Sequence, residues 1–72
     1  MSIAEFVKQK RKERKMTQVM LADRAGVGLR FIRDLEQGKE SLRLDKVNQV
    51  LDMFSARVVP GEIERDISYA SR

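Results

Sequence analysis

Arg30 and Arg33 stand three positions apart in the segment that reads GVGLRFIRDLEQG from residue 26 to residue 38. On a helical wheel at about 100° per residue, these arginines and Gln37 lie opposite the apolar side chains of the segment. A guanidinium can donate two hydrogen bonds to guanine O6 and N7, and a glutamine amide matches adenine N6 and N7. The same residue types are common on any solvated helix face, so the wheel leaves base reading and simple solvation as alternatives.

The two glycines before this helix, Gly26 and Gly28, raise a second chemistry, because glycine-rich loops also cradle the phosphates of nucleotide cofactors. A dinucleotide loop needs G-x-G-x-x-G after a strand, whereas Phe31 takes the place of the third glycine and a helical pattern precedes the turn. No G-x-x-x-x-G-K-[ST] motif occurs either. We therefore interpret the glycines as a corner between two helices, with Gly26 ending one and Gly28 beginning the next.

The composition argues against an enzyme. The chain of 72 residues has no cysteine and no histidine, which removes disulfides, thiolate zinc sites and the commonest general base. We predict no catalytic, cofactor-binding or metal-binding residues. A core this small is marginal on its own, so we expect a homo-oligomer.

The charge distribution favours a polyanionic partner. The formal net charge is +4, and residues 1–43 hold eleven Lys and Arg against six Asp and Glu, whereas residues 44–72 hold four against five. The basic run KQKRKERK, residues 8–15, is either a solvated helix face or a phosphate-facing surface. No apolar run is long enough to span a membrane and no signal-peptide core is present, so we expect a cytoplasmic protein without a membrane partner.

Four helices must position the arginines. Ser2, with Glu5 three residues on, predicts a capping box for a helix to residue 15, and Thr17 caps a second helix over residues 18–25. The third runs from the N-cap Gly28 to residue 37 and stops at Gly38. The fourth covers residues 44–54, with a buried face of Leu44, Val47, Val50, Leu51 and Phe54. Met53 falls on its opposite side, where an interface could use it.

A short strand follows the fourth helix. The segment SARVVP, residues 55–60, has the β-branched pair and terminating proline of a strand. One strand needs a partner, and we find no second strand candidate in the chain. Pairing of Ala56, Arg57, Val58 and Val59 with the same strand of a second copy is therefore expected. This divides the chain into a helical domain (1–54), a dimerising strand (55–60) and a flexible tail (61–72).

The segment MTQVMLADRAGVGLRFIRDLEQGK resembles the helix-turn-helix core of lambda-repressor-like (Cro and xenobiotic-response-element) DNA-binding domains. The positions in register are Thr17-Gln18, Leu21-Ala22, Gly26-Val27, Ile32, Leu35-Glu36 and Gly38. With its flanking helices the resemblance covers about residues 3–54. The stretch from Gly26 to Phe54 followed by a short strand is most similar to the HipB-type antitoxins of bacterial toxin–antitoxin modules.

The resemblance implies an all-α domain of four or five helices whose third helix enters the major groove of an inverted-repeat operator. It implies that Arg30 and Arg33 reach bases or nearby phosphates, and that Gln18, Lys39 and Arg43 contact phosphates. To these we add Leu29 and Gln37 as base contacts and Thr17 and Ser41 as phosphate contacts. Arg11 and Glu36 match a pair with a structural role. The narrower resemblance implies a homodimer, a HipA-type kinase toxin as partner and autoregulation of the operon.

Three departures from the family pattern affect these expectations. Val19 and Met20 stand where polar or acidic residues are usual, which predicts exposed apolar surface on the second helix. Gly28 replaces a hydroxyl-bearing cap, and Leu29 occupies a groove-facing position that is usually polar. Leu29 offers a contact to a thymine methyl instead.

We therefore expect a sequence-specific DNA-binding repressor, an antitoxin by the narrower resemblance. The alternatives are a stand-alone or phage-type regulator of the same family, and a protein-binding module that keeps the scaffold without binding DNA. An RNA-binding protein is disfavoured because the chain has few aromatic residues for stacking.

Overall fold

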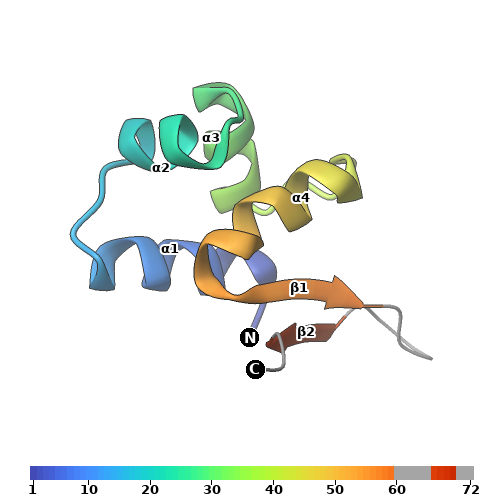
Figure 1. Ribbon diagram of the computed structural model, residues 1–72. Coiled ribbons are helices and arrows are strands. Elements are labelled where there is room, and N and C mark those ends of the chain that lie inside the picture. Colours follow the sequence, from blue (N-terminus) through green and yellow to red (C-terminus); the bar gives the residue numbers. More distant parts are fainter. Residues whose placement is uncertain (60–65, 70–72) are drawn as a thin grey trace.

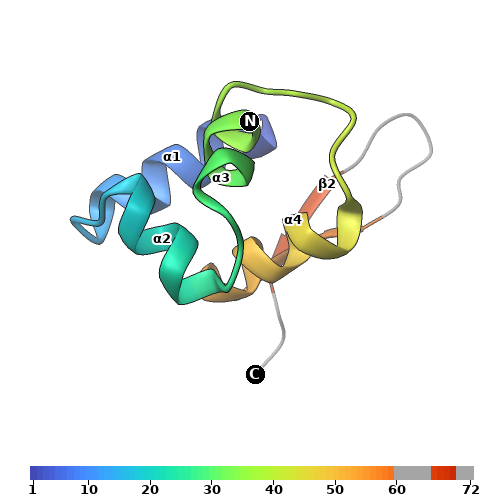
Figure 2. The same cartoon turned by 90° about the horizontal axis from the view of Figure 1, so that it is seen from above.

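The computed structural model describes the backbone of residues 1–59 and 66–69 and the side chains of residues 1–56. The described part is mostly helical (Figures 1 and 2). Its elements in chain order are α1 (Ile3–Glu13), α2 (Gln18–Ala25), α3 (Leu29–Glu36), α4 (Leu44–Leu51), the 3-10 helix η1 (Asp52–Phe54), β1 (Ala56–Val59) and β2 (Asp66–Tyr69). In Figure 1, α1 and the strands lie on one side of α4, and α2 and α3 lie on the other.

The first two helices begin at the caps predicted from sequence. The Ser2 hydroxyl accepts a hydrogen bond from the Glu5 amide, and the Glu5 carboxylate accepts one from the Ser2 amide, both at 3.1 Å. The hydroxyl of Thr17 accepts from the Met20 amide at 3.1 Å. These contacts satisfy amide groups that have no partner within the helix, which explains where α1 and α2 start.

The corner between α2 and α3 has the conformation expected of its glycines. Gly26 closes α2 with φ of 75°, in the left-handed region, and Gly28 begins α3 with an extended backbone and no side-chain cap. Gln49 of α4 holds the corner from the other side, because its amide nitrogen donates to the carbonyl oxygens of Ala25 at 2.7 Å and Gly26 at 3.2 Å. The turn is therefore fixed both by local backbone geometry and by a distant side chain.

The fourth helix differs from the prediction at its two ends. Regular α-helix stops at Leu51, and residues 52–54 continue as η1. Leu44, which we expected in the buried face, is 42% exposed, because the first turn of α4 projects beyond the core. Met53, expected on the outer side, is partly buried against the core instead, and its carbonyl accepts a hydrogen bond from Arg14 at 2.8 Å.

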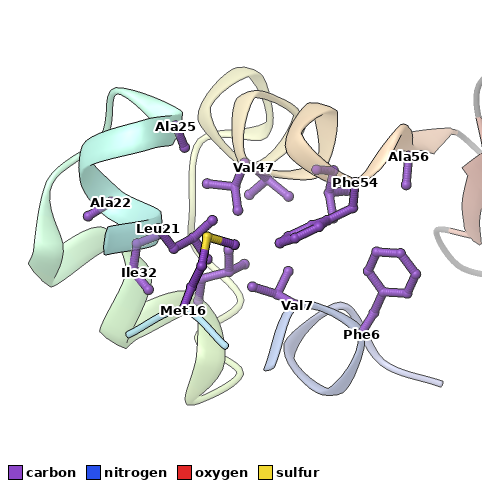
Figure 3. Packing of buried hydrophobic residues seen from close by; sticks show 13 residues of the cluster. Phe6, Val7, Met16, Leu21, Ala22, Ala25, Ile32, Val47, Phe54 and Ala56 are labelled. Carbon is purple, nitrogen blue, oxygen red and sulfur yellow. The ribbon is translucent and has the colours of Figure 1, made fainter. Parts of the chain in front are cut away.

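One hydrophobic core joins the elements (Figure 3). Leu21, Ile32, Leu51, Val7 and Val50, contributed by all four helices, are fully buried. The rings of Phe6 and Phe54 meet edge to face with centroids 6.4 Å apart, a favoured aromatic geometry. α3 packs against α1 and α2 in this core, so its inner face is held by closely packed side chains and its outer face is left to solvent.

The strand predicted at residues 56–59 forms, but its observed partner differs from the expected one. β1 pairs antiparallel with β2 of the same chain, with Ala56 opposite Tyr69 and Val59 opposite Asp66. Residues 66–69 fall in the segment expected to be a flexible tail, and the sequence reasoning missed this strand. A hairpin within one chain brings its strands together at low cost in loop entropy. Residues 60–65 and 70–72 lie outside the described residues, as do the side chains of Arg57, Val58 and Val59.

Candidate nucleic-acid interface

The outer face of α3 presents the charged and polar side chains predicted for it. Arg30, Arg33 and Gln37 are all exposed. Within the part of the chain that the structure describes, none of the three side chains makes a hydrogen bond or ion pair with another residue. α3 and its C-cap residue Gln37 thus present two guanidinium groups and one amide that are available to an external ligand.

Leu29 differs from the other three predicted base-contact residues. It is half-buried and packs against the hydrophobic core, and so does Phe31, two residues later. Only part of the Leu29 side chain therefore remains to meet a ligand. The groove-facing position expected for Leu29 is therefore only partly exposed.

A buried ion pair fixes the end of α3 to α1. Arg11 donates from Nε to Oε2 of Glu36 at 2.7 Å and from Nη2 to Oε1 at 3.0 Å. Its Nη1 also donates to the carbonyl oxygen of Met16 at 2.9 Å, just before α2. The structural role expected for Arg11 and Glu36 is therefore confirmed, and the pair connects α1, the α1–α2 loop and α3.

Glu36 is charged in spite of its burial, since its side chain is only 2% exposed. Burial alone would raise the pKa of Glu36, but hydrogen bonds from Arg11 and Gln18 and the charges of Arg11 and Lys8 together lower it. The same contact with Glu36 raises the pKa of Arg11. The pair is therefore ionised throughout the physiological pH range.

Gln18 lies at the first position of α2, where phosphate binding was expected. Its amide nitrogen donates to Oε1 of Glu36 at 3.2 Å, so the side chain already joins α2 to α3. Thr17 is exposed, and its hydroxyl is the cap of α2. Both residues thus surround the positive end of the α2 dipole, a position suited to a phosphate oxygen.

The three remaining phosphate candidates lie after α3. Ser41 is exposed, whereas Lys39 and Arg43 are paired with carboxylates. The Lys39 ammonium lies 3.7 Å from Oδ2 of Asp34. Arg43 donates from Nε and Nη2 to the two carboxylate oxygens of Asp45 at 3.2 and 2.8 Å. The hydrogen bonds from Arg43 lower the pKa of Asp45.

Sequence reasoning missed three residues that shape this surface: Asp34, Asp45 and Gln49. The spacing of two residues between Arg43 and Asp45 was visible in the sequence, but it does not by itself indicate a contact. Gln49 has no local signal, because its partners lie 23 and 24 residues earlier. Its position on α4 one residue before a buried valine gave no indication of a contact with the corner.

Among the residues whose side chains the structure describes, no group of three or more Asp, Glu, His or Cys could hold a metal ion. No helix in this described part is sufficiently long and apolar to cross a membrane.

Comparison with known proteins agrees with the geometry. Residues 7–54 match the family model described as "Helix-turn-helix". An uncharacterized HTH-type transcriptional regulator, y4mF, of Sinorhizobium fredii strain NGR234 is 46% identical over 63 residues, covering 83% of each chain. No solved structure matches significantly.

Proposed function

Since the chain belongs to the lambda-repressor-like helix-turn-helix family of DNA-binding transcriptional regulators, we propose that it is a sequence-specific repressor that reads bases with α3. The observation that carries this proposal is the outer face of α3. Arg30, Arg33 and Gln37 are exposed there and lack partners within the described chain. These residue types match the donor and acceptor patterns of the major groove.

In this proposal, phosphate contacts hold the helix in register. Thr17, Gln18 and the first amides of α2 take one phosphate, and Lys39, Ser41 and Arg43 take phosphates beyond the end of α3. Such contacts fix position and orientation but carry no sequence information. Arg30 and Arg33 select bases, with Gln37 and the exposed part of Leu29 in secondary contacts.

A homodimer on an inverted repeat completes the proposal. A ribbon of two strands leaves one outer edge on β1, to which residues 56–59 of a second copy can pair. The small core supports this, because a second copy adds buried surface. Two α3 helices related by a two-fold axis then read half-sites about 34 Å apart, or a multiple of that distance.

The narrower proposal is that the protein is an antitoxin of the HipB type, which represses its own operon and binds a HipA-type kinase toxin. Its support is the similarity of residues 26–54, with the strand that follows, to such antitoxins. Co-expression with the product of the neighbouring gene tests it. A stable complex with a kinase-like neighbour is expected, whereas a neighbour unrelated to kinases would leave a stand-alone regulator.

The base-reading role is tested on Arg33. An operator is selected from random duplexes with the wild-type protein, and the affinities of wild type, Arg33→Ala and Arg33→Lys are measured on every single-base variant. If Arg33 makes a bidentate contact, Arg33→Ala should lose about 1–3 kcal/mol of binding free energy on the selected operator. This loss should be absent on duplexes in which the contacted base pair has been replaced. Arg33→Lys keeps the charge but not the planar pair of donors, so it should also lose discrimination there.

Two results would contradict the proposal. An equal loss on all sequences would make Arg33 a phosphate contact. A wild-type affinity that stays constant between about 50 and 200 mM salt would exclude DNA binding of this kind and favour a protein-binding module.

A further inference from the structure

The basic side chains around α3 fall into two groups that the sequence does not distinguish. Arg30 and Arg33 have no partner within the described chain, whereas Lys39 and Arg43 each face a carboxylate of the same chain. The first pair lies on the helix proposed to read bases. The second pair lies where only phosphates are proposed to bind.

We propose that Asp34 and Asp45 limit the affinity of the protein for DNA phosphates by occupying Lys39 and Arg43 in the free state. This inference rests on the proposed function and adds to it two acidic residues that set the strength of non-specific binding. A phosphate oxygen and a carboxylate oxygen compete for the same donors, so the internal contact must be exchanged when DNA binds.

The Arg43–Asp45 pair is the stronger of the two contacts. Nε and Nη2 of Arg43 are directed at the two oxygens of one carboxylate, the same pair of donors that would bind a phosphate. Both side chains are well exposed, 71% for Arg43 and 65% for Asp45, so DNA can reach them without unfolding of the chain.

The Lys39–Asp34 contact repeats the arrangement at the end of α3. Asp34 lies on α3 itself and is less exposed, at 23%, while Lys39 is 52% exposed. The Lys39 amide also donates to the Asp34 carbonyl at 3.0 Å, which holds the two residues together. Asp34 therefore directs Lys39 back along α3.

The physical consequence concerns salt. A free cation that meets a phosphate releases a counterion from DNA, and each such contact contributes about 0.9 to the slope of log affinity against log salt. When a Lys or Arg side chain leaves its carboxylate to bind a phosphate, the carboxylate attracts a salt cation from solution. The net release is smaller, and so are the affinity and the salt slope.

The test uses a short duplex of mixed sequence, so that it measures phosphate binding alone. Wild type, Asp45→Asn, Arg43→Gln and the double variant are compared over a range of salt concentrations. Asp45→Asn should bind about two- to five-fold more tightly, the range expected for loss of an exposed ion pair. Its salt slope should steepen by at most about 0.9. The gain should vanish when Arg43→Gln is already present.

Asp52→Asn is the matched control. Asp52 is exposed at the opposite end of α4 and makes no ion pair within the described residues, yet it gives the same change in net charge. It should tighten binding less than Asp45→Asn. If Asn at position 45 weakens the start of α4, a second double-mutant cycle tests the same idea at the other contact. It compares wild type with Asp34→Asn, Lys39→Gln and the variant that carries both changes.

The outcomes separate the two proposals. Equal gains from Asp45→Asn and Asp52→Asn, or gains that persist without Arg43 and without Lys39, would overturn the competition between carboxylate and phosphate. Salt-dependent binding by wild type without any gain in the variants would overturn this inference and leave the proposed function intact. No binding by any variant would overturn both.

Discussion

Arg11 and Glu36 form a two-point ion pair, with Nε to Oε2 at 2.7 Å and Nη2 to Oε1 at 3.0 Å, that joins α1 to the last residue of α3. Their side chains are 12% and 2% exposed. The pair lies directly beneath the helix proposed to read bases, so its loss should affect both the free energy of unfolding and the position of α3.

Breaking the pair from one side should be costly. Arg11→Met keeps much of the apolar stem but leaves the Glu36 carboxylate buried without its main partner, and a loss of about 3–5 kcal/mol is expected. Urea unfolding at neutral pH measures it. Adding Glu36→Leu removes the orphaned charge and should recover much of the loss, whereas a double variant as unstable as Arg11→Met would contradict this explanation.

The pH dependence of stability should change when Glu36 is replaced. Its pKa in the folded protein is lowered from the ordinary value of 4.5. Ionised Glu36 therefore stabilises the folded state at pH values above 4.5, and this contribution is lost as the pH falls through the lower folded pKa. Glu36→Gln should be less stable than wild type at neutral pH, with the difference narrowing in acid.

Unfolding of both proteins over a series of pH values checks this expectation. Glu5 and Asp45, whose pKa values are also lowered, are present in both proteins and cancel in the difference. A difference that is constant with pH would show that the Glu36 charge contributes nothing.

Leu51 and Leu44, one on each end of α4, should respond differently to the same substitution. Leu51 is fully buried, so Leu51→Ala should cost about 2–5 kcal/mol. Leu44 is 42% exposed, and Leu44→Ala should cost less than about 1 kcal/mol. Thermal and urea unfolding of the two variants measure this, and similar losses would place Leu44 in the core after all.

The two glycines of the corner should also differ. Gly26 has φ of 75°, and an added Cβ would lie 3.0 Å from Nε2 of Gln49, so Gly26→Ala should cost about 1–2 kcal/mol from backbone strain alone. Gly28 has φ of −73° and open space around it. Gly28→Ser should stabilise by a few tenths of a kcal/mol, roughly what a hydroxyl cap adds over glycine. A destabilising Gly28→Ser would show that α3 cannot use such a cap.

Local chemistry explains which features could be predicted from the sequence. The capping box of Ser2 and Glu5, the Thr17 cap and the left-handed Gly26 each depend on a few neighbouring residues, and each is observed. The face of α3 that carries Arg30 and Arg33 follows from helical periodicity in the same way.

Features that depend on distant partners were missed. Gln49 gave no signal of its contact with the corner, because its partners Ala25 and Gly26 lie 24 and 23 residues earlier. Leu44 fits the apolar period of α4, but its exposure depends on where the rest of the core ends. Residues 66–69 fall in the segment expected to be a flexible tail, and only pairing with β1 makes them a strand.

Because Gln49 hydrogen-bonds to Ala25 and Gly26, the helix-turn-helix segment depends on α4 for its conformation and cannot be moved to another protein by itself. A graft of residues 17–37 onto another scaffold would lose both the amide that holds the corner and Arg11 beneath α3. In the intact protein the carbonyl oxygens of Ala25 and Gly26 lose the Gln49 amide only when α4 moves away from the corner. Redesign of the helix proposed to read bases therefore has to keep α1 and α4 together with α3.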